Sequence, residues 1–290
     1  MFVIIGANGN TGRVAAETLI EGHQAVRVVL RDERTAAAWQ AKGAEVVHGS
    51  LEDVASLERA FVGARGVYLL LPPDNASNDT RTRARRLFGN VAQALTQAKV
   101  PHVVLLSSIS AQHADGNGPI AALHIGEQIL GAIPGLARTF LRASSFLENH
   151  AAVLGAVTGH GILPTFLPAD LTYAQISTAD IGRFAAKALI EPATAGETRV
   201  WNLAGAVDAS ERDVAAAIGA ILGREIPVVE NPLAAVVPTF TGFGLSEHVA
   251  GLYREMYEGI VSGHIAFVAG EPVLRGSEGP REVLGRMLAG

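Results

Sequence analysis

Three glycines lie between an apolar run and a helical pattern at the start of the chain, and this arrangement constrains the fold more than any other feature. The segment reads FVIIGANGNTGRVAAETLI, with Gly6, Gly9 and Gly12 spaced three residues apart. The run Phe2–Ile5 has no polar alternation, as expected for a strand buried on both faces of a parallel sheet. A strand, a glycine turn and a helix in this order open a doubly wound α/β fold.

Short apolar runs alternate with helical patterns through the first half of the chain. Strands are expected over Phe2–Ile5, Ala25–Leu30, Ala44–Val47, Gly66–Leu71, His102–Ser107 and Arg138–Leu141. Helices are expected over RVAAETLIEG, over VASLERAFVG, and over a segment that carries the basic cluster RTRARR on its solvated face and runs to Ala98. Because parallel strands are joined by right-handed crossovers, the alternation predicts a Rossmann-type doubly wound parallel sheet.

The pattern becomes less regular after about residue 145. One helix is expected over STADIGRFAAKALI, beginning at Ser177 or Thr178, and another over SERDVAAAIGAIL, where Ser210 and Asp213 have capping-box spacing. The strand RVWNLAG lies between them. We expect residues 1–145 to form a dinucleotide-binding Rossmann domain whose sheet is completed by about residues 173–205. Residues 146–290 are expected to form mostly a smaller α/β substrate lobe that is not fully separable.

Composition excludes several classes of function. The 290 residues carry a formal net charge of −5, without the basic excess typical of nucleic-acid binding. The chain has no cysteine, which excludes disulfides and thiol chemistry, and its histidines lack metal-ligand spacing. No apolar stretch reaches the roughly 18 residues of a membrane helix, and the opening run is too short for a signal peptide. We expect a cytoplasmic monomer or homodimer that binds a small molecule rather than nucleic acid, a membrane or a metal.

The glycine turn is a candidate anion site. Backbone N–H groups and the positive end of the helix dipole favour a phosphate at such a turn. Gly6 allows the chain to turn, Gly9 allows the backbone to approach a pyrophosphate, and Gly12 allows close helix–strand packing. The spacing is one residue wider than the common fingerprint; a purely structural turn is the alternative to a dinucleotide site. The candidate phosphate-binding residues are Gly6, Asn8, Gly9, Asn10, Thr11, Gly12 and Arg13.

The end of the second strand indicates which dinucleotide is bound. An acidic residue there would hold the ribose 2′-hydroxyl of NAD. The strand instead ends in Arg31, and both Arg31 and Arg13 can meet a 2′-phosphate. Asp32 and Glu33 follow directly, so a shift of one residue would favour NAD. We expect NADP(H), with NAD(H) as the less favoured alternative.

Several blocks of the chain resemble the atypical short-chain dehydrogenases/reductases of the NmrA-like family. The blocks read GANGNTGR, VVLLSSISA, LHIGEQIL, RTFLRASSFLENH and ISTADIGRFAA. The resemblance covers nearly the whole chain. It is closest to the triphenylmethane reductase and NAD(P)H:quinone oxidoreductase group, which carries a similar H-x-x-x-E stretch and the same T-x-L-R strand.

This resemblance implies further cofactor contacts. Residues after the third strand should border the adenine, those after the fourth should cover the dinucleotide, and the ends of the fifth and sixth strands should lie near the nicotinamide and its carboxamide. Many relatives have an acidic residue where Ser50 stands. The residues implied are Ser50, Leu51, Leu71, Pro72, Pro73, Ser107, Ser108, His124, Ala143, Ser144 and Phe146.

The catalytic pair of most short-chain dehydrogenases is missing. In those enzymes a tyrosine exchanges a proton with the substrate, and a lysine four residues later lowers the tyrosine pKa. Here no tyrosine is followed by lysine at that spacing, and Ile120 and His124 stand where the resemblance assigns the pair. Alcohol–ketone chemistry by that pair is therefore not expected.

The candidate catalytic residues are His124 and Ser108. A neutral imidazole can both donate and accept, so His124 could hold a ribose hydroxyl or give a proton to the reduced substrate. The alternative is a helix histidine that is satisfied locally. The candidate substrate contacts are Phe146, Asn149, His150, Phe240 and Phe243. The last two belong to Val236–Gly244, which is either a mobile lid loop or an anchored surface loop.

Two classes of function follow. The first is an NADPH-dependent oxidoreductase that transfers a hydride to a small, flat or conjugated acceptor such as a quinone, dye, enone or imine. The alternative is an NADP-binding redox sensor of the NmrA type without catalysis. An open apolar cleft beside the nicotinamide site would favour the enzyme, and the lack of a substrate cavity would favour the sensor. No nucleophile elbow supports a hydrolase.

Overall fold

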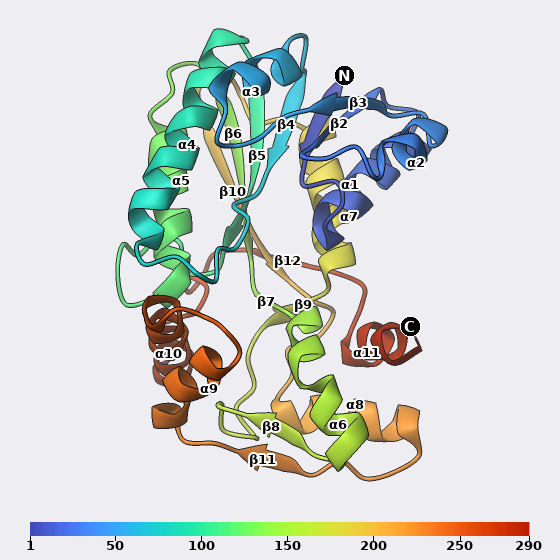
Figure 1. The fold of residues 1–290 in the computed structure, drawn as a ribbon, viewed down its shortest axis with the longest axis vertical. Coiled ribbons are helices and arrows are strands. Elements are labelled where there is room, and N and C mark those ends of the chain that lie inside the picture. The colour runs from blue at the N-terminus through green and yellow to red at the C-terminus, as the bar shows by residue number, and fades with distance from the viewer. Residues whose placement is uncertain (290) are drawn as a thin grey trace.

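The computed structural model describes residues 1–289 and shows a parallel sheet between two layers of helices, with a second group of elements below its carboxyl edge (Figure 1). The strands are β1 (Phe2–Ile5), β2 (Val26–Leu30), β3 (Glu45–His48), β4 (Gly66–Leu69), β5 (His102–Ser108), β6 (Ala137–Ala143), β7 (Ser145–Phe146), β8 (Leu163–Thr165), β9 (Gln175–Ile176), β10 (Thr198–Ala204), β11 (Val228–Glu230) and β12 (Val273–Arg275). The α-helices are α1 (Asn10–Glu21), α2 (Ala36–Ala41), α3 (Val54–Phe61), α4 (Thr80–Gln97), α5 (Ala121–Gly131), α6 (Leu154–His160), α7 (Thr178–Ile190), α8 (Glu211–Leu222), α9 (Val236–Gly242), α10 (Glu247–Ser262) and α11 (Pro280–Ala289). Short 3₁₀ turns span Gly118–Ile120, Leu147–Val153 and Leu233–Ala235.

The central sheet has the doubly wound topology that the sequence predicts. Over residues 1–289 it contains eight strands in the order β12-β10-β6-β5-β4-β1-β2-β3, and every pairing is parallel. The winding direction reverses between β1 and β4. In open α/β sheets, ligands bind outside the carboxyl ends of the strands at such a reversal.

Two apolar cores cover the two faces of this sheet. Phe2 and Ile4 of β1 join the core beneath α1, α2 and α7, whereas Val3 and Ile5 join the core beneath α3, α4 and α5. Figure 1 shows these two groups of helices on opposite sides of the sheet. Every residue of β1 is buried, which explains why its sequence has no polar alternation.

The carboxyl-terminal half contributes both to the sheet and to the lower group of elements. The strand expected over RVWNLAG is β10, which pairs with β6. β12 adds an edge strand that the sequence did not predict. The lower group packs α6, α8 and α11 around a small core that contains Val157, Ile218 and Leu284. Ser210 and Asp213 form the predicted capping box at the start of α8.

The segment Val236–Gly244 is not the loop that the sequence analysis expected. Val236–Gly242 is the short helix α9, which packs against α10 in the lower group (Figure 1). Among the described residues, no helix is long and apolar enough to cross a membrane.

Candidate functional site

The glycine turn has the geometry of a phosphate cradle. Gly6 has φ +77°, a conformation that side chains disfavour, and a Cβ on Gly12 would lie 2.4 Å from the Gly6 carbonyl oxygen. Gly9 is the N-cap of α1, and no side chain caps the helix there. Amide groups of the first turn of α1 therefore point out of the helix without an intrahelical acceptor. These observations fit a dinucleotide pyrophosphate at this turn.

Two other residues of the turn use their side chains inside the protein. The Asn8 side chain donates to Thr35 Oγ1 at 2.8 Å, and Trp39 Nε1 donates to Asn8 Oδ1 at 2.9 Å. Thr11 is buried and accepts a hydrogen bond from the Tyr68 hydroxyl at 2.8 Å. Asn8 and Thr11 therefore hold the turn in place, and the exposed Asn10 and Arg13 remain at its surface.

The loop after β2 carries both charges that the sequence analysis weighed. Arg31 is exposed, and its carbonyl accepts a hydrogen bond from His48 Nε2 at 2.9 Å. Asp32 is paired with Arg34 through Nη2–Oδ2 at 3.0 Å. Arg13 lies on α1, where it contacts Glu17 at 3.3 Å. Arg31 is thus the predicted cation that the structure leaves available at the end of β2.

Residues after β3 are bonded within the protein, whereas those after β4 connect the glycine turn to the cavity described below. Ser50 Oγ accepts from the Glu52 amide at 3.2 Å, and the Leu51 carbonyl accepts from Asn90 Nδ2 at 2.9 Å. Leu70 packs directly on Gly6, because a Cβ there would lie 2.8 Å from Leu70 Cδ2. Leu71, the next residue, lines the cavity.

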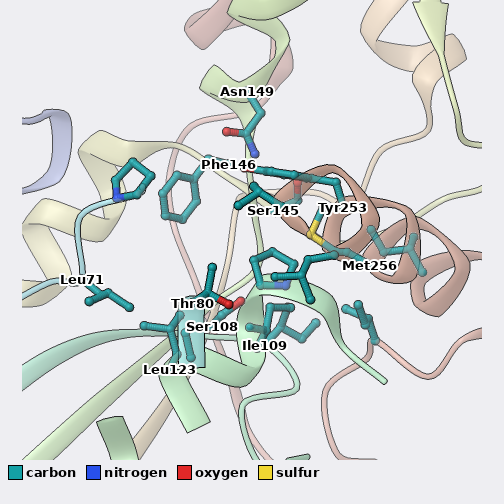
Figure 2. Close-up of a pocket in the computed structure, with 18 of the residues that line it drawn as sticks. Leu71, Thr80, Ser108, Ile109, Leu123, Ser145, Phe146, Asn149, Tyr253 and Met256 are labelled. Atoms are coloured by element: carbon teal, nitrogen blue, oxygen red, sulfur yellow. The ribbon is translucent and has the colours of Figure 1, made fainter. Parts of the chain in front are cut away.

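A mostly apolar cavity of about 350 Å³ lies at the carboxyl ends of β4, β5 and β6. Ligand sites typically have about 300–1,000 Å³ and a few polar groups in an apolar lining. Figure 2 shows Phe146, Ser145, Ser108 and Leu123 around this space, with Tyr253 and Met256 of α10 on the other side. The predicted residues that line it are Leu71, Pro72, Pro73, Ser108, Ser144, Phe146 and Asn149.

One wall of the cavity comes from residues that the sequence analysis did not single out. Its α10 residues are Val249, Leu252, Tyr253, Met256 and Ile260. Their helical spacing puts these apolar side chains on one face of the helix. The sequence shows this apolar face, but it does not show what the face covers. Arg83 on α4 also lines the cavity and forms an ion pair with Asp74 at 3.2 Å.

The two tyrosines of the cavity wall are poor acids. Burial, and then the adjacent Glu211 carboxylate, raise the pKa of Tyr173 well above its ordinary value. The Tyr173 hydroxyl donates to Glu211 Oε1 at 2.6 Å. Burial also raises the pKa of Tyr253. Neither tyrosine has the lowered pKa that a neighbouring lysine would give it.

His124 has a fixed tautomer. Its Nδ1 lies 2.8 Å from the Ala111 carbonyl oxygen, which can only accept, so Nδ1 carries the hydrogen and Nε2 is left as an acceptor in the neutral ring. His124 is half-buried; its neighbour Leu123 lines the cavity, whereas His124 itself does not. The structure therefore leaves Nε2 as the nitrogen that could meet a ribose hydroxyl.

Ser107 and Ser108 end β5 in different environments. The Ser107 hydroxyl donates to the buried Glu127 at 2.6 Å, and Arg142 donates to the same carboxylate at 2.7 Å. This network joins β5, α5 and β6 beneath the cavity. Ser108 lines the cavity, and no side-chain hydrogen bond to its hydroxyl is seen within residues 1–289. Ser108 is thus the serine whose hydroxyl is free for a ligand.

Three predicted substrate residues lie outside the cavity lining. His150 is buried and contacts Glu211 at 3.3 Å. Burial lowers the pKa of His150, but the hydrogen bond and charge of Glu211, together with the Leu147 carbonyl and the charge of Glu148, raise it overall. Phe240 stacks on Tyr253 with ring centroids 4.9 Å apart, behind the cavity wall. Phe243 is 74% exposed. The segment that was expected to be either a lid loop or an anchored surface loop is therefore mostly the helix α9, which packs against α10.

No group of three or more metal-ligating side chains is found within the described chain.

The model of the NmrA-like family matches residues 1–259. An NAD(P)H azoreductase of Xenophilus azovorans is 25% identical over 267 residues, which covers 89% of this chain and 86% of that protein.

Two solved structures resemble the whole chain. An NADPH-dependent quinone oxidoreductase of Escherichia coli, complexed with NADPH, is 22% identical with a TM-score of 0.77, and the match covers 99% of this chain and 100% of that one. A triphenylmethane reductase of Citrobacter sp. is 18% identical with a TM-score of 0.82, and the match covers 99% of each chain. At these identities the two structures establish the fold.

Proposed function

The chain belongs to the NmrA-like family, and on that premise we propose that it is an NADPH-dependent reductase of small, flat or conjugated acceptors. The observation that carries the proposal is the mostly apolar cavity of about 350 Å³ at the carboxyl ends of β4, β5 and β6. Its lining extends past the predicted cofactor residues to Asn149 and to Tyr253 and Met256 of α10, which supports room for an acceptor beside the nicotinamide. A redox sensor needs the cofactor site alone. The similarity to an NAD(P)H azoreductase and to a quinone oxidoreductase complexed with NADPH supports the same class of enzyme.

The residues present fit the cofactor from its phosphates to its nicotinamide. Gly9 and the first turn of α1 would bind the pyrophosphate, and Arg31 would bind the 2′-phosphate. NADPH, when bound, supplies the hydride. Leu71 and Pro72 would cover the dinucleotide, and Phe146 would border the carboxamide at the cavity.

The protein's contribution to the reaction is mainly position. Leu123, Phe146 and Met256 give the cavity flat and adaptable apolar surfaces that exclude water from the acceptor (Figure 2). An acceptor held in near-attack geometry in such a space reacts without a covalent step by the protein. The size and lining support acceptors of one or a few rings.

Proton delivery is where this site departs from a ketone reductase. The Ser108 hydroxyl can donate a hydrogen bond to an acceptor oxygen, and His124 can hold the ribose through Nε2. The raised pKa of Tyr173 disfavours its use as the acid. Quinones and cationic dyes need little acid assistance, because hydride addition gives a stabilised anion or a neutral product. These acceptors are therefore favoured over simple ketones.

The proposal is tested by NADPH oxidation against a panel of quinones, cationic dyes, enones, imines and simple ketones. We expect turnover of a quinone or dye and little turnover of a ketone. Met256→Trp, which fills the cavity, should abolish turnover while NADPH still binds; Arg254→Trp on the exposed side of α10 is the matched control. Tight NADPH binding without turnover of any acceptor would instead support the redox sensor.

A further inference from the structure

The loop between β2 and α2 is attached directly to the glycine turn. Thr35 Oγ1 and Asn8 exchange hydrogen bonds of 2.8 and 3.0 Å, and the buried Trp39 adds one of 2.9 Å to the same amide. Because Asn8 lies between Gly6 and Gly9, these bonds hold residues 31–35 against the proposed phosphate site. The charge that this loop presents is therefore the charge that the adenosine ribose meets.

Asp32, the acidic residue closest to the end of β2, already accepts hydrogen bonds from Arg34. Arg34 Nε donates to Asp32 Oδ1 at 3.1 Å, Arg34 Nη2 donates to Oδ2 at 3.0 Å, and the Arg34 amide also donates to Oδ1 at 3.1 Å. Both carboxylate oxygens thus have partners. Arg31, one residue earlier, has no side-chain partner in the described chain.

We propose that Arg34 is a specificity-determining residue, which masks the Asp32 carboxylate and thereby makes this loop select NADPH over NADH. The inference rests on the proposed function and identifies a residue that sets its cofactor preference. A free carboxylate at this position would accept hydrogen bonds from a ribose 2′-hydroxyl and repel a 2′-phosphate. A bidentate arginine offsets the charge and fills the acceptor sites, which leaves Arg31 to bind the phosphate.

The pairing persists over the working range of pH. Hydrogen bonds from the Arg34 side chain, and then from its amide, lower the pKa of Asp32 to about 2. The carboxylate is therefore ionised, and attracted to Arg34, at any pH near neutrality. The Arg34 side chain is 86% exposed, so its replacement should not disturb the fold.

The test measures dissociation constants of NADPH and NADH by calorimetry, without turnover. We expect Arg34→Ala to tighten NADH and weaken NADPH, with a change of about tenfold in their ratio, as one charge-assisted contact allows. Adding Asp32→Asn to Arg34→Ala should remove the gain for NADH, because the unmasked carboxylate is then gone. Arg85→Ala, which deletes an exposed arginine of α4 on the other face of the sheet, is the matched control for net charge.

Three outcomes would overturn the inference. Arg34→Ala could weaken NADPH without tightening NADH, which would make Arg34 a direct phosphate contact. The double variant could keep the gain for NADH, so that Asp32 would not be its source. Glu33→Gln could change the ratio instead, which would assign the role to the neighbouring acid. A wild-type protein that binds neither cofactor would refute the proposed function itself, a distinct result.

Discussion

Gly12 and Gly9 differ in the space around their Cα atoms. We therefore expect Gly12 to be needed mainly for stability and Gly9 mainly for cofactor binding. A Cβ on Gly12 would lie 2.4 Å from the Gly6 carbonyl oxygen, whereas a Cβ on Gly9 would have that oxygen at 3.3 Å and no other neighbour within 4 Å. Gly12→Ala should therefore lower the free energy of unfolding by about 1–3 kcal/mol, as overpacking does. Gly9→Ala needs a shift of only a few tenths of an ångström, so it should cost less stability than Gly12→Ala. It should weaken NADPH, because its methyl group enters the proposed phosphate space. Urea unfolding and calorimetry check both, and equal effects of the two variants on stability would contradict the assignment.

Arg31 carries the prediction for the 2′-phosphate. Arg31→Ala should weaken NADPH by about tenfold to a hundredfold and leave NADH nearly unchanged, because the lost partner is present in NADPH alone. The measurement is a titration of both cofactors into both proteins. Preference of the wild type for NADH, or an equal loss for both cofactors, would show that the end of β2 does not read the ribose phosphate.

At the scale of elements, α10 is held to the loop before α4 by its N-cap residue, Ser246. The Ser246 hydroxyl accepts from the Val249 amide at 3.1 Å and donates to the Ser77 carbonyl at 2.6 Å. Ser246→Ala loses this N-cap and should lower the free energy of unfolding by about 0.5–2 kcal/mol. Because α10 forms a wall of the cavity, the acceptor KM should rise as well.

Ser262→Ala is the control, since Ser262 lies exposed at the other end of the same helix and donates only to Gly259 at 3.3 Å. Urea unfolding should find it within about 0.5 kcal/mol of the wild type. Hydrogen exchange in the first turn of α10 should accelerate in Ser246→Ala alone. Equal exchange in the two variants would mean that Ser246 does not anchor the wall.

The elements of the first half could be predicted because the residues of each short segment show by themselves whether that segment is buried. A strand buried on both faces must be mostly apolar, as β1 is throughout and β5 is over Val103–Leu106. Segment 236–244 was misread because Pro238 and its glycines resemble loop residues. Pro238 lies in the first turn of α9, where a missing N–H costs no hydrogen bond. Gly242 is the last residue of the helix.

At the scale of the whole molecule, His102 makes stability depend on pH. Burial, and then the charge of Arg199, lower its pKa from 6.5 to about 4, so the folded protein resists protonation that the unfolded chain accepts. This histidine therefore costs no stability above pH 6.5. Its contribution becomes unfavourable as the pH falls towards 4, to a total of about 3 kcal/mol. Urea unfolding between pH 7 and 4 measures the slope.

The matched variant is His102→Gln, whose amide can still form a hydrogen bond with Thr139, the partner of His102 Nε2 at 3.1 Å. Its stability should fall less steeply over the same range of pH. If the free energy of unfolding fell equally steeply with pH in the two proteins, the acid sensitivity would come from groups other than His102.

The residues proposed for the cofactor are easier to bring together from the sequence than those that line the cavity. The glycine turn and Arg31 lie within one βαβ unit, so spacing alone brings them together. The cavity joins Ser108, Thr80 and Met256, which meet only when α10 returns across the ends of the strands (Figure 2). Likewise, β12 is three residues long and partly exposed, so its pattern carries no strand signal.

The late position of β12 has a consequence for biosynthesis. β10 ends at Ala204, and its outer neighbour begins only at Val273. A ribosome adding about 5–20 residues per second needs roughly 3–14 s to make the intervening segment. During that interval the nascent sheet ends in β10, whose unpaired N–H and C=O groups are a template for strands of other chains. Until β12 emerges, Asn202–Ala204 of β10 therefore lack the partner that covers them in the finished sheet, and this edge stays open to aggregation.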